Sequence, residues 1–283
     1  MDKKFTFVIC AMMAIAFSAC DNDSPSENKK DNLPRIQSFV WDGTKSSYPE
    51  QLNGLNSFSY DSDGRIKSYA TPSQKTTYTY DGLNCVGVMT SIPDGEKLQE
   101  QYIVFNKAGR PVSEESTSWY NNSTASMKYG YDSEGRIISY DFYADEKRNI
   151  YAKFKYDSST GLMSEAIGDY QIGSGKRVNL KYRYYYSDRP NPVAFYPEFH
   201  QIFDAEPALA FTGIDGYGRD RLIDRIVVSV EGTDAPPIEA FLFSYEFSAG
   251  GKLTSITETL ALLDDDGNVM ATHPLVKITD IRY

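Results

Sequence analysis

Residue types that carry metal and acid–base chemistry are scarce in this sequence of 283 residues. It holds two histidines, His200 and His273, and it contains neither a His-Glu-x-x-His nor a Gly-x-Ser-x-Gly motif. Glu198 and His200 would share one side of an extended segment, an arrangement that suits two metal ligands or an acid–base pair. A solvated loop with a neutral histidine is the favoured alternative, so no catalytic residue is predicted.

A second acidic group lies near the C-terminus, in residues 264–268 (DDDGN). Asp264 and Asp266 place carboxylates beside a glycine, and carboxylate oxygens attract hard cations such as Ca2+. The segment lacks the distal glutamate of a helix-loop-helix calcium site, and the same residues make a strong hairpin turn. The turn is favoured, which leaves Glu198, His200, Asp264 and Asp266 as weak metal candidates. No cofactor is indicated.

Aromatic side chains are abundant and offer binding chemistry of another kind. The chain has 22 Tyr, 15 Phe and 2 Trp residues, and large flat rings suit stacking against sugars or peptides. Trp119 and Tyr120, which lead into the polar residues 121–124, are the candidate ligand-binding pair. The alternative is that such strand aromatics fill the core or form cross-strand pairs.

The charge balance excludes one class of partner. The chain carries 39 acidic and 29 basic side chains, for a formal net charge of -10, and it has no local block of Lys and Arg. A negative surface repels a phosphate backbone. The sequence therefore predicts that this protein does not bind nucleic acid.

The N-terminal residues are typical of an export signal. Lys3 and Lys4 precede an apolar stretch at residues 5–17, which is shorter than the ~20 residues of a membrane-spanning helix. Residues 17–20 (FSAC) resemble a bacterial lipobox, with Phe where Leu is usual. This resemblance implies cleavage before Cys20 and a diacylglycerol thioether, with fatty acids such as palmitate, on its sulfur. Ordinary cleavage without a lipid is the alternative.

Loss of the leader and lipidation of Cys20 leave Cys85 as the one free thiol of the mature chain. No intramolecular disulfide can then form, so packing must hold the exported fold together. Residues 21–32 contain no large apolar side chain and are expected to form a flexible tether. Asp21 and Asp23 resemble the signal that sends lipoproteins of Bacteroides-type bacteria to the outer face of the outer membrane; a plain solvated linker is the alternative.

From Leu33 onward one short unit recurs along the chain. Residues 60–66 (YDSDGRI) and 131–137 (YDSEGRI) are nearly identical, and residues 105–111 (FNKAGRP) and 156–162 (YDSSTGL) are variants. Asp or Asn followed by small polar residues and a glycine fits a type I hairpin turn with a glycine bulge. Positive φ is therefore predicted for Gly64, Gly109, Gly135 and Gly161.

Side chains alternate between apolar and polar on both sides of these turns. Residues 127–131 (MKYGY) have apolar side chains at the odd positions, and in residues 180–186 (LKYRYYY) one face is Leu and Tyr. This period of two indicates strands, and the turn signals divide the chain into about sixteen of them. The expected fold is all-β: a long antiparallel meander that is closed, or nearly closed, like a barrel, because an open sheet of that length would expose its edges.

The expected organisation is a leader at residues 1–19, a tether at 20–33 and one β domain at 34–283. The repeat pattern breaks at residues 187–221, where several prolines disfavour a central strand. Residues 204–212 (DAEPALAFT) could form a short helix, and the glycines that follow match no dinucleotide or P-loop fingerprint. This insertion is expected to cap or plug the aromatic face of the sheet.

The hairpin units, the lipobox and the segment at residues 208–222 together resemble an uncharacterised family of Bacteroides-type lipoproteins with a porin-like β fold. The hairpin unit alone is similar to the YD repeats of large bacterial surface and toxin shells. The resemblance covers most of the mature chain and implies the fold. The family has no established activity to carry over.

A barrel that crosses the membrane is not expected. Spanning strands need ~9–11 residues and an uninterrupted apolar set that faces lipid. The stretches between turns are mostly shorter, and both faces carry charges, as in residues 110–117 (RPVSEEST). The expected attachment to the membrane is therefore the lipid on Cys20.

Three hypotheses for function follow. The leading one is a lipid-anchored, non-enzymatic envelope protein that binds a glycan, a peptide or a partner protein through an open concavity. The second is a structural or scaffolding lipoprotein with a filled interior. The third is a hydrolase with two carboxylates about 5–10 Å apart across a cleft.

Overall fold

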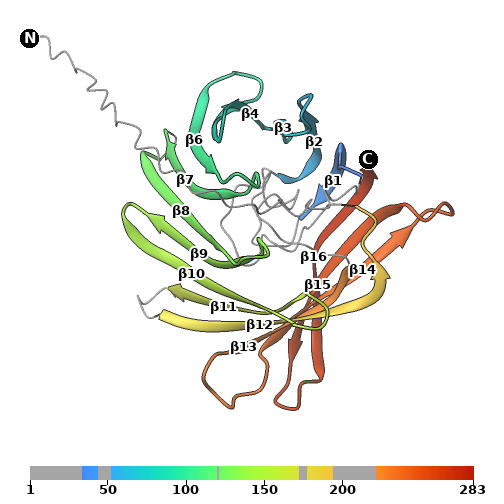
Figure 1. Ribbon diagram of the computed structural model, residues 1–283. Helices are drawn as coiled ribbons and strands as arrows, with labels where there is room; N and C mark the ends of the chain where they lie inside the picture. The colour runs from blue at the N-terminus through green and yellow to red at the C-terminus, as the bar shows by residue number, and fades with distance from the viewer. Residues whose placement is uncertain (1–33, 44–51, 120, 172–176, 194–220) are drawn as a thin grey trace, which may run out of the picture. The chain divides into compact units, whose positions relative to one another are not determined.

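Sixteen antiparallel strands form a closed barrel in the computed structural model (Figure 1). The structure describes residues 34–43, 52–119, 121–171, 177–193 and 221–283. Each strand pairs with the next along the chain, and β1 (Ser38–Asp42) closes the barrel against β16 (Val269–Arg282), where Trp41 lies opposite Ile278. The predicted all-β meander, its closure and its number of strands are confirmed.

The remaining strands follow one another around the barrel in chain order. The first are β2 (Gly54–Tyr60), β3 (Ile66–Ala70), β4 (Gln74–Asp81), β5 (Asn84–Ser91), β6 (Lys97–Phe105), β7 (Pro111–Ser118) and β8 (Ser123–Tyr131). They continue as β9 (Ile137–Ala144), β10 (Lys147–Tyr156), β11 (Met163–Gln171), β12 (Arg177–Pro190), β13 (Arg221–Val230), β14 (Glu239–Phe247) and β15 (Leu253–Leu263). Most are joined by short turns, and antiparallel neighbours can be connected in that way.

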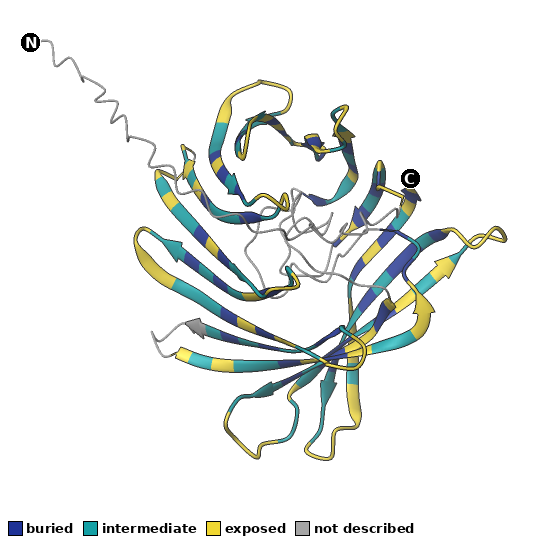
Figure 2. Ribbon diagram, in the orientation of Figure 1, coloured by how far each residue is buried: buried dark blue, intermediate teal, exposed yellow. Residues whose placement is uncertain are grey.

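Alternate side chains along the strands are buried, as the dark and light bands of Figure 2 show. In β8, Lys128 is exposed between the buried Met127 and Tyr129. In β12, Arg183 is exposed between the buried Tyr182 and Tyr184. Buried side chains from strands all around the barrel belong to one hydrophobic cluster. The apolar face is therefore the inner face, and the polar face forms the outer wall.

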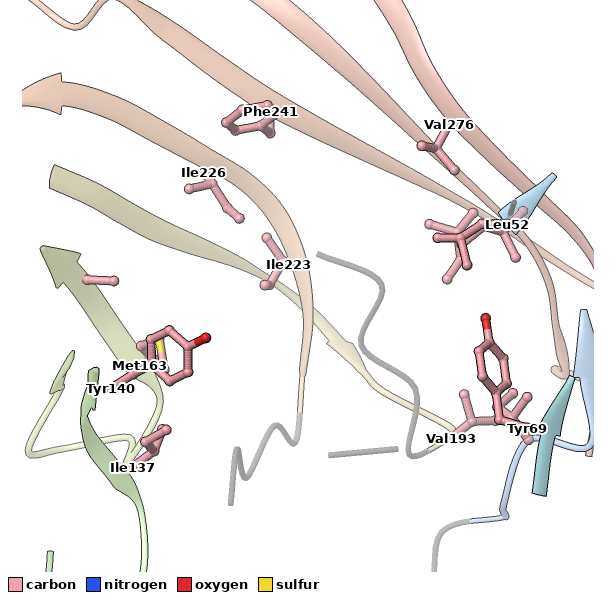
Figure 3. Packing of buried hydrophobic residues seen from close by; sticks show 14 of the residues in the cluster. Leu52, Tyr69, Ile137, Tyr140, Met163, Val193, Ile223, Ile226, Phe241 and Val276 are labelled. Carbon is pink, nitrogen blue, oxygen red and sulfur yellow. The ribbon is translucent and has the colours of Figure 1, made fainter. Parts of the chain in front are cut away.

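Aromatic and branched side chains line much of the inner face (Figure 3). Ile137, Tyr140 and Met163 come from β9 and β11, and Tyr69 comes from β3. Complete burial of a large apolar side chain stabilises a fold by ~1.5–3 kcal/mol. Cys85 is buried as a free thiol, so within the described ranges this packing acts without a covalent cross-link.

The repeated turns have the predicted geometry. Asp61 Oδ1 accepts hydrogen bonds from the backbone amides of Asp63 and Arg65, at 3.0 and 2.8 Å. Asp132 Oδ1 caps its own turn in the same way. Such side-chain caps are the reason why Asp and Asn favour turns. Positive φ, between 71° and 77°, is confirmed at Gly64, Gly109, Gly135 and Gly161.

Two expectations about the strands are wrong in detail. The strands were expected to be mostly shorter than the ~9–11 residues that span a membrane, but nine of the sixteen have nine residues or more, and β12 and β16 each have 14. β12 also enters the proline-containing segment and ends at Pro190, which lies opposite Arg221 after a shift in register. Proline is tolerated at a bulged strand end because no regular ladder hydrogen bond is needed there. The helix expected at residues 204–212 lies outside the described residues.

A few polar side chains share the inner face. Gln101 of β6 and Glu114 of β7 are almost fully buried, whereas Glu115 is exposed. Two adjacent residues of a strand point to opposite faces, so one of the two glutamates must point inward. The expectation that both faces of residues 110–117 carry charge is thus confirmed.

Candidate functional site

The repeated turns all lie at one end of the barrel. In a meander every second connection is at the same end, so the connections that follow the even-numbered strands share one end. We call this end the repeat rim; its short turns are residues 61–65, 82–83, 106–110, 132–136, 157–162 and 248–252. The other end, which carries the connections that follow odd-numbered strands, is the opposite rim.

Tyrosine hydroxyls link neighbouring hairpins on the repeat rim. A tyrosine near the end of an even-numbered strand donates a hydrogen bond of 2.7–2.9 Å to a backbone carbonyl at the start of the preceding odd-numbered strand. The pairs are Tyr60 with Ile36, Tyr80 with Ile66, Tyr131 with Pro111, Tyr156 with Ile137, Tyr186 with Met163, and Tyr245 with Ile223. At the closing strand the direction reverses, because the Tyr283 hydroxyl accepts from the Leu253 amide at 3.0 Å.

A cation lies over many of these rings and completes what we call the aromatic–cation ring. The residue directly before the hydrogen-bonded carbonyl is an arginine in four hairpins, and in the last hairpin a lysine, Lys252, stands directly before the residue whose amide binds Tyr283. The distances from Cζ, or from Nζ of lysine, to the ring centroid are 5.4 Å for Arg35–Tyr60, 4.4 Å for Arg65–Tyr80, 6.0 Å for Arg110–Tyr131, 4.7 Å for Arg136–Tyr156 and 5.6 Å for Lys252–Tyr283. Such contacts contribute ~0.5–1 kcal/mol at exposed sites.

The glycine of the unit also leaves room for the preceding arginine. A β-carbon at Gly64 would overlap the guanidinium of Arg35. At Gly135 a β-carbon would lie 3.1 Å from Cζ of Arg110, whose guanidinium donates a hydrogen bond to the Gly135 carbonyl. Gly161 has no heavy atom within 4 Å of that position. The first two glycines therefore meet a steric requirement in addition to their positive φ.

Between β10 and β14 the aromatic–cation ring is interrupted, in the sense that no cation stands directly before the bonded carbonyl. A differently placed cation, Arg189 at the end of β12, has its Cζ 4.3 Å from the ring centroid of Phe247. Leu162 stands directly before the carbonyl that Tyr186 binds, and Leu222 stands directly before the carbonyl that Tyr245 binds. Both leucines are buried and occupy the place that arginine has in the other hairpins. A further departure occurs at the short turn of residues 82–83, where the next aromatic residue, Phe105, has no hydroxyl.

A pocket of about 410 Å³ lies at this interruption. Its volume falls in the lower part of the ~300–1,000 Å³ range of small-molecule sites. The lining residues come from the turn after β10, from the end of β12 and from the start of β13: Ser159, Thr160, Leu162, Asp188, Pro190 and Arg221. It is the candidate functional site of the described part of the chain.

The polar groups of the pocket are close to solvent and easy to rearrange. Arg221 Nη1 lies 3.1 Å from Asp188 Oδ1, and the Asp188 side chain is fully exposed. An exposed ion pair contributes only ~0–1 kcal/mol, so a ligand can replace one partner at little cost.

The two hydroxyls of the pocket are oriented by a neighbouring carboxylate. Ser159 Oγ and Thr160 Oγ1 donate hydrogen bonds to Asp157 Oδ1, at 2.6 and 3.0 Å. Hydrogen bonds from the Ser159 hydroxyl and the Thr160 amide lower the pKa of Asp157 to about 2. Both hydroxyl groups donate their hydrogen bonds to Asp157, so toward other partners their oxygens act as acceptors. Thr160 Oγ1 already accepts one hydrogen bond, from the Leu162 amide at 3.3 Å.

Trp119, predicted as part of a ligand-binding pair, follows β7 on the opposite rim. Its side chain is 45% exposed, and Lys97 Nζ lies 4.3 Å from the ring centroid. Lys97 also forms an ion pair of 2.5 Å with Glu100. The exposed ring can therefore accept a flat or sugar-like ligand by stacking. Tyr120 lies outside the described residues, and the structure does not bring Trp119 together with the pocket on the repeat rim.

The structure describes only some of the candidate metal ligands. Glu198, His200 and the lipidation site Cys20 lie outside the described residues. Asp264 Oδ1 accepts hydrogen bonds from the amides of Asp266 and Asn268, at 3.0 and 2.7 Å, which is the geometry of the favoured turn. Over the ranges that the structure covers, no group of three or more His, Cys, Asp or Glu side chains is placed to hold a metal ion.

Sequence reasoning missed the pocket. One signal was available, because Leu162 replaces the arginine of an otherwise repeated unit. The equivalence of Leu222 was not visible, since it depends on the hydrogen bond from Tyr245 to Ile223. Asp188 and Arg221 are 33 residues apart in the chain and meet only because β12 pairs with β13.

Solved structures with a similar fold include two porin-like proteins. A porin-like protein from Bacteroides uniformis is 12% identical, with a TM-score of 0.58, and the match covers 88% of this chain and 98% of that one. A porin-like protein from Bacteroides vulgatus is 13% identical, with a TM-score of 0.59 and the same coverage of each chain. The sequence matches no protein-family model, and no curated protein is significantly similar to it. At this identity the likeness shows the fold: the chain has the closed barrel of these porin-like proteins.

Proposed function

We propose that this protein is a lipid-anchored, non-enzymatic binding protein of the cell envelope, whose barrel stays in water at the outer membrane. The polarity of the outer wall carries this proposal. Lys128 in β8, Lys153 in β10 and Arg183 in β12 are exposed between buried neighbours. A basic residue that faces lipid at the midplane costs ~2–4 kcal/mol. The wall is therefore suited to water and poorly suited to lipid.

Ion pairs on the outer wall support the same conclusion. Lys155 Nζ lies 2.6 Å from Glu165 Oε1 on the neighbouring strand. Lys181 Nζ lies 2.6 Å from a carboxylate oxygen of Glu231. Separately from these ion pairs, no helix in the described ranges has the length and hydropathy needed to cross a membrane.

A barrel of this kind needs a separate means of attachment, and the lipobox supplies one. One acyl chain gives only marginal binding to a bilayer, and stable anchoring takes two signals. The diacylglycerol expected on Cys20 carries two acyl chains. It would hold the barrel at the membrane through the tether of residues 20–33.

Labelling and phase partition test the anchor. Cells grown with an alkyne analogue of palmitate should label the wild-type chain, and Cys20→Ala should remove the label. Cys85→Ala is the matched control, because Cys85 is buried inside the barrel, and its label should be unchanged. In a detergent phase-separation assay, folded Cys20→Ala should move to the aqueous phase. Retention in the detergent phase of a Cys20→Ala chain whose leader has been removed, as checked by its mass, would show that the wall itself contacts lipid.

The binding role rests on the exposed ring of Trp119. Glycan and peptide arrays probed with the full chain should give a signal that Trp119→Ala removes. Tyr102→Ala is the matched control, since Tyr102 on the outer wall has the same 45% exposure. Equal signals from the wild type and Trp119→Ala would reject this surface. Anchoring without any array signal would favour the scaffolding alternative.

A further inference from the structure

We propose that the pocket at the interruption of the aromatic–cation ring binds an uncharged saccharide. The pocket is on the repeat rim, whereas Trp119 is on the opposite rim. It is thus a second site, and it does not depend on the binding surface proposed above. Four of its features point to this ligand: its charge, its hydrogen-bonding groups, its apolar wall and its origin in the repeat.

The charges of the lining residues cancel. Asp188 supplies the single carboxylate and Arg221 the single guanidinium among the described residues that line the pocket. An anion would approach Asp188 unfavourably, and a cation would approach Arg221 unfavourably. An uncharged ligand can contact both groups without either penalty.

The hydrogen-bonding groups match adjacent hydroxyls. Arg221 offers only donors, whereas the Asp188 carboxylate offers only acceptors. Ser159 Oγ also acts as an acceptor toward a ligand, because the Ser159 hydroxyl donates its own hydrogen bond to Asp157. A sugar hydroxyl both donates and accepts, so neighbouring hydroxyls of one ring can satisfy Arg221 and Asp188 together. Hydrogen bonds to charged groups are the stronger class, which favours these two residues as anchors.

The apolar part of the lining suits the C–H face of a sugar ring. Leu162 and Pro190 also line the pocket, and Leu162 is itself buried. A volume of about 410 Å³ accommodates a terminal sugar or a short saccharide. A longer chain segment would have to extend out of the pocket.

The pocket arises where the repeat changes. In the complete hairpins an arginine such as Arg136 extends over the tyrosine of the next hairpin, 4.7 Å from the Tyr156 centroid. Leu162 is shorter and uncharged, and it lines the pocket. Leu162→Arg should therefore complete the ring and occupy the pocket.

Saturation-transfer difference NMR on the full chain tests the proposal. The protein is held in lauryldimethylamine oxide, a detergent without a sugar headgroup. The probes are the methyl glycosides of glucose, galactose, mannose and N-acetylglucosamine, with glucuronate as the charged comparator. At least one neutral glycoside should bind, and more tightly than glucuronate. Arg221→Ala and Asp188→Asn should each weaken binding about tenfold, and Leu162→Arg should abolish it.

Two controls keep the outcome clear. Lys155→Ala removes an exposed ion pair of the same hairpin on the outer wall, and it should bind as the wild type does. Asp188→Asn changes a fully exposed side chain, so it tests the pocket even if another variant fails to fold. The proposal is overturned if no neutral glycoside binds, or if Arg221→Ala and Asp188→Asn bind like the wild type. It is also overturned if Trp119→Ala alone removes binding, a result that would leave the proposed function intact.

Discussion

Two sectors of the repeat rim share the tyrosine hydrogen bond but differ in the residue that stands directly before the bonded carbonyl. In the complete sector, strands β7–β10, Arg110 and Arg136 lie over Tyr131 and Tyr156. In the interrupted sector, strands β11–β14, the tyrosine hydrogen bonds persist, but leucines replace the arginines. The barrel closes through both sectors. The hydroxyl link is therefore the shared structural element, and the cation can be given up where a pocket is formed.

Glycine substitutions should give the largest difference in unfolding free energy between the two kinds of turn. Gly161→Ala in the unobstructed turn should lower the free energy of unfolding by ~1–2 kcal/mol, because alanine must adopt positive φ. Gly64→Ala lies in a hairpin where Arg35 covers Tyr60, and it should lower the free energy of unfolding further, because the new β-carbon also displaces Arg35 from Tyr60. Urea unfolding followed by tryptophan fluorescence measures both. Equal costs would mean that the guanidinium does not constrain the turn.

Removal of the tyrosine hydroxyl should act equally in both sectors. Tyr156→Phe and Tyr186→Phe each leave a backbone carbonyl without its hydrogen bond, at a cost of ~1–2 kcal/mol in unfolding free energy. Tyr102→Phe on the outer wall is the control and should change stability by less than ~0.5 kcal/mol. A large cost for Tyr156→Phe alone would show that the hydroxyl link is not the shared element.

Acid should weaken the turns of both sectors to a smaller extent. Partial burial raises the pKa of Asp132, but hydrogen bonds from the Arg136 amide and side chain outweigh it and lower the net pKa. The pKa of Asp157 is lowered to about 2 by its Ser159 and Thr160 hydrogen bonds. A carboxyl group with a lowered folded pKa stabilises the fold above its unfolded pKa of ~3.9 and loses this effect as the pH falls through the folded pKa.

The urea midpoint should therefore fall between about pH 4 and pH 2. Asp132→Asn and Asp157→Asn should each make that decline shallower, because asparagine can cap the turn without titrating. Asn106 already has this role in the turn of residues 106–110. An unchanged acid profile in both variants would show that the turn caps do not determine acid stability.

Local features of the fold were predictable because they depend on neighbours in the sequence. The positive φ of Gly64 and Gly135 and the caps formed by Asp61 and Asp132 follow from the chemistry of a single turn. The period of two predicted which face of residues 127–131 is buried. Closure followed from the number of strands, since a long open sheet would expose its edges.

Contacts between hairpins were not predictable in the same way. Arg136 and Tyr156 are 20 residues apart, and their contact depends on the register of β9 and β10. The pocket depends likewise on the pairing of Pro190 with Arg221 after a shift in register. Trp119 was found from its residue type and its position before a polar turn. Its place on the rim opposite to the pocket required the strand order.

The coupling energy between Arg136 and Tyr156 tests most directly the claim that the repeat works by joining one hairpin to the next. A double-mutant cycle with Arg136→Met and Tyr156→Leu, read out as urea unfolding free energy, removes the contributions that each side chain makes alone. We expect a favourable coupling of ~0.5–1 kcal/mol, the size of an exposed cation–π contact. A coupling of zero within error would contradict the account, because the arginine would then stabilise only its own turn.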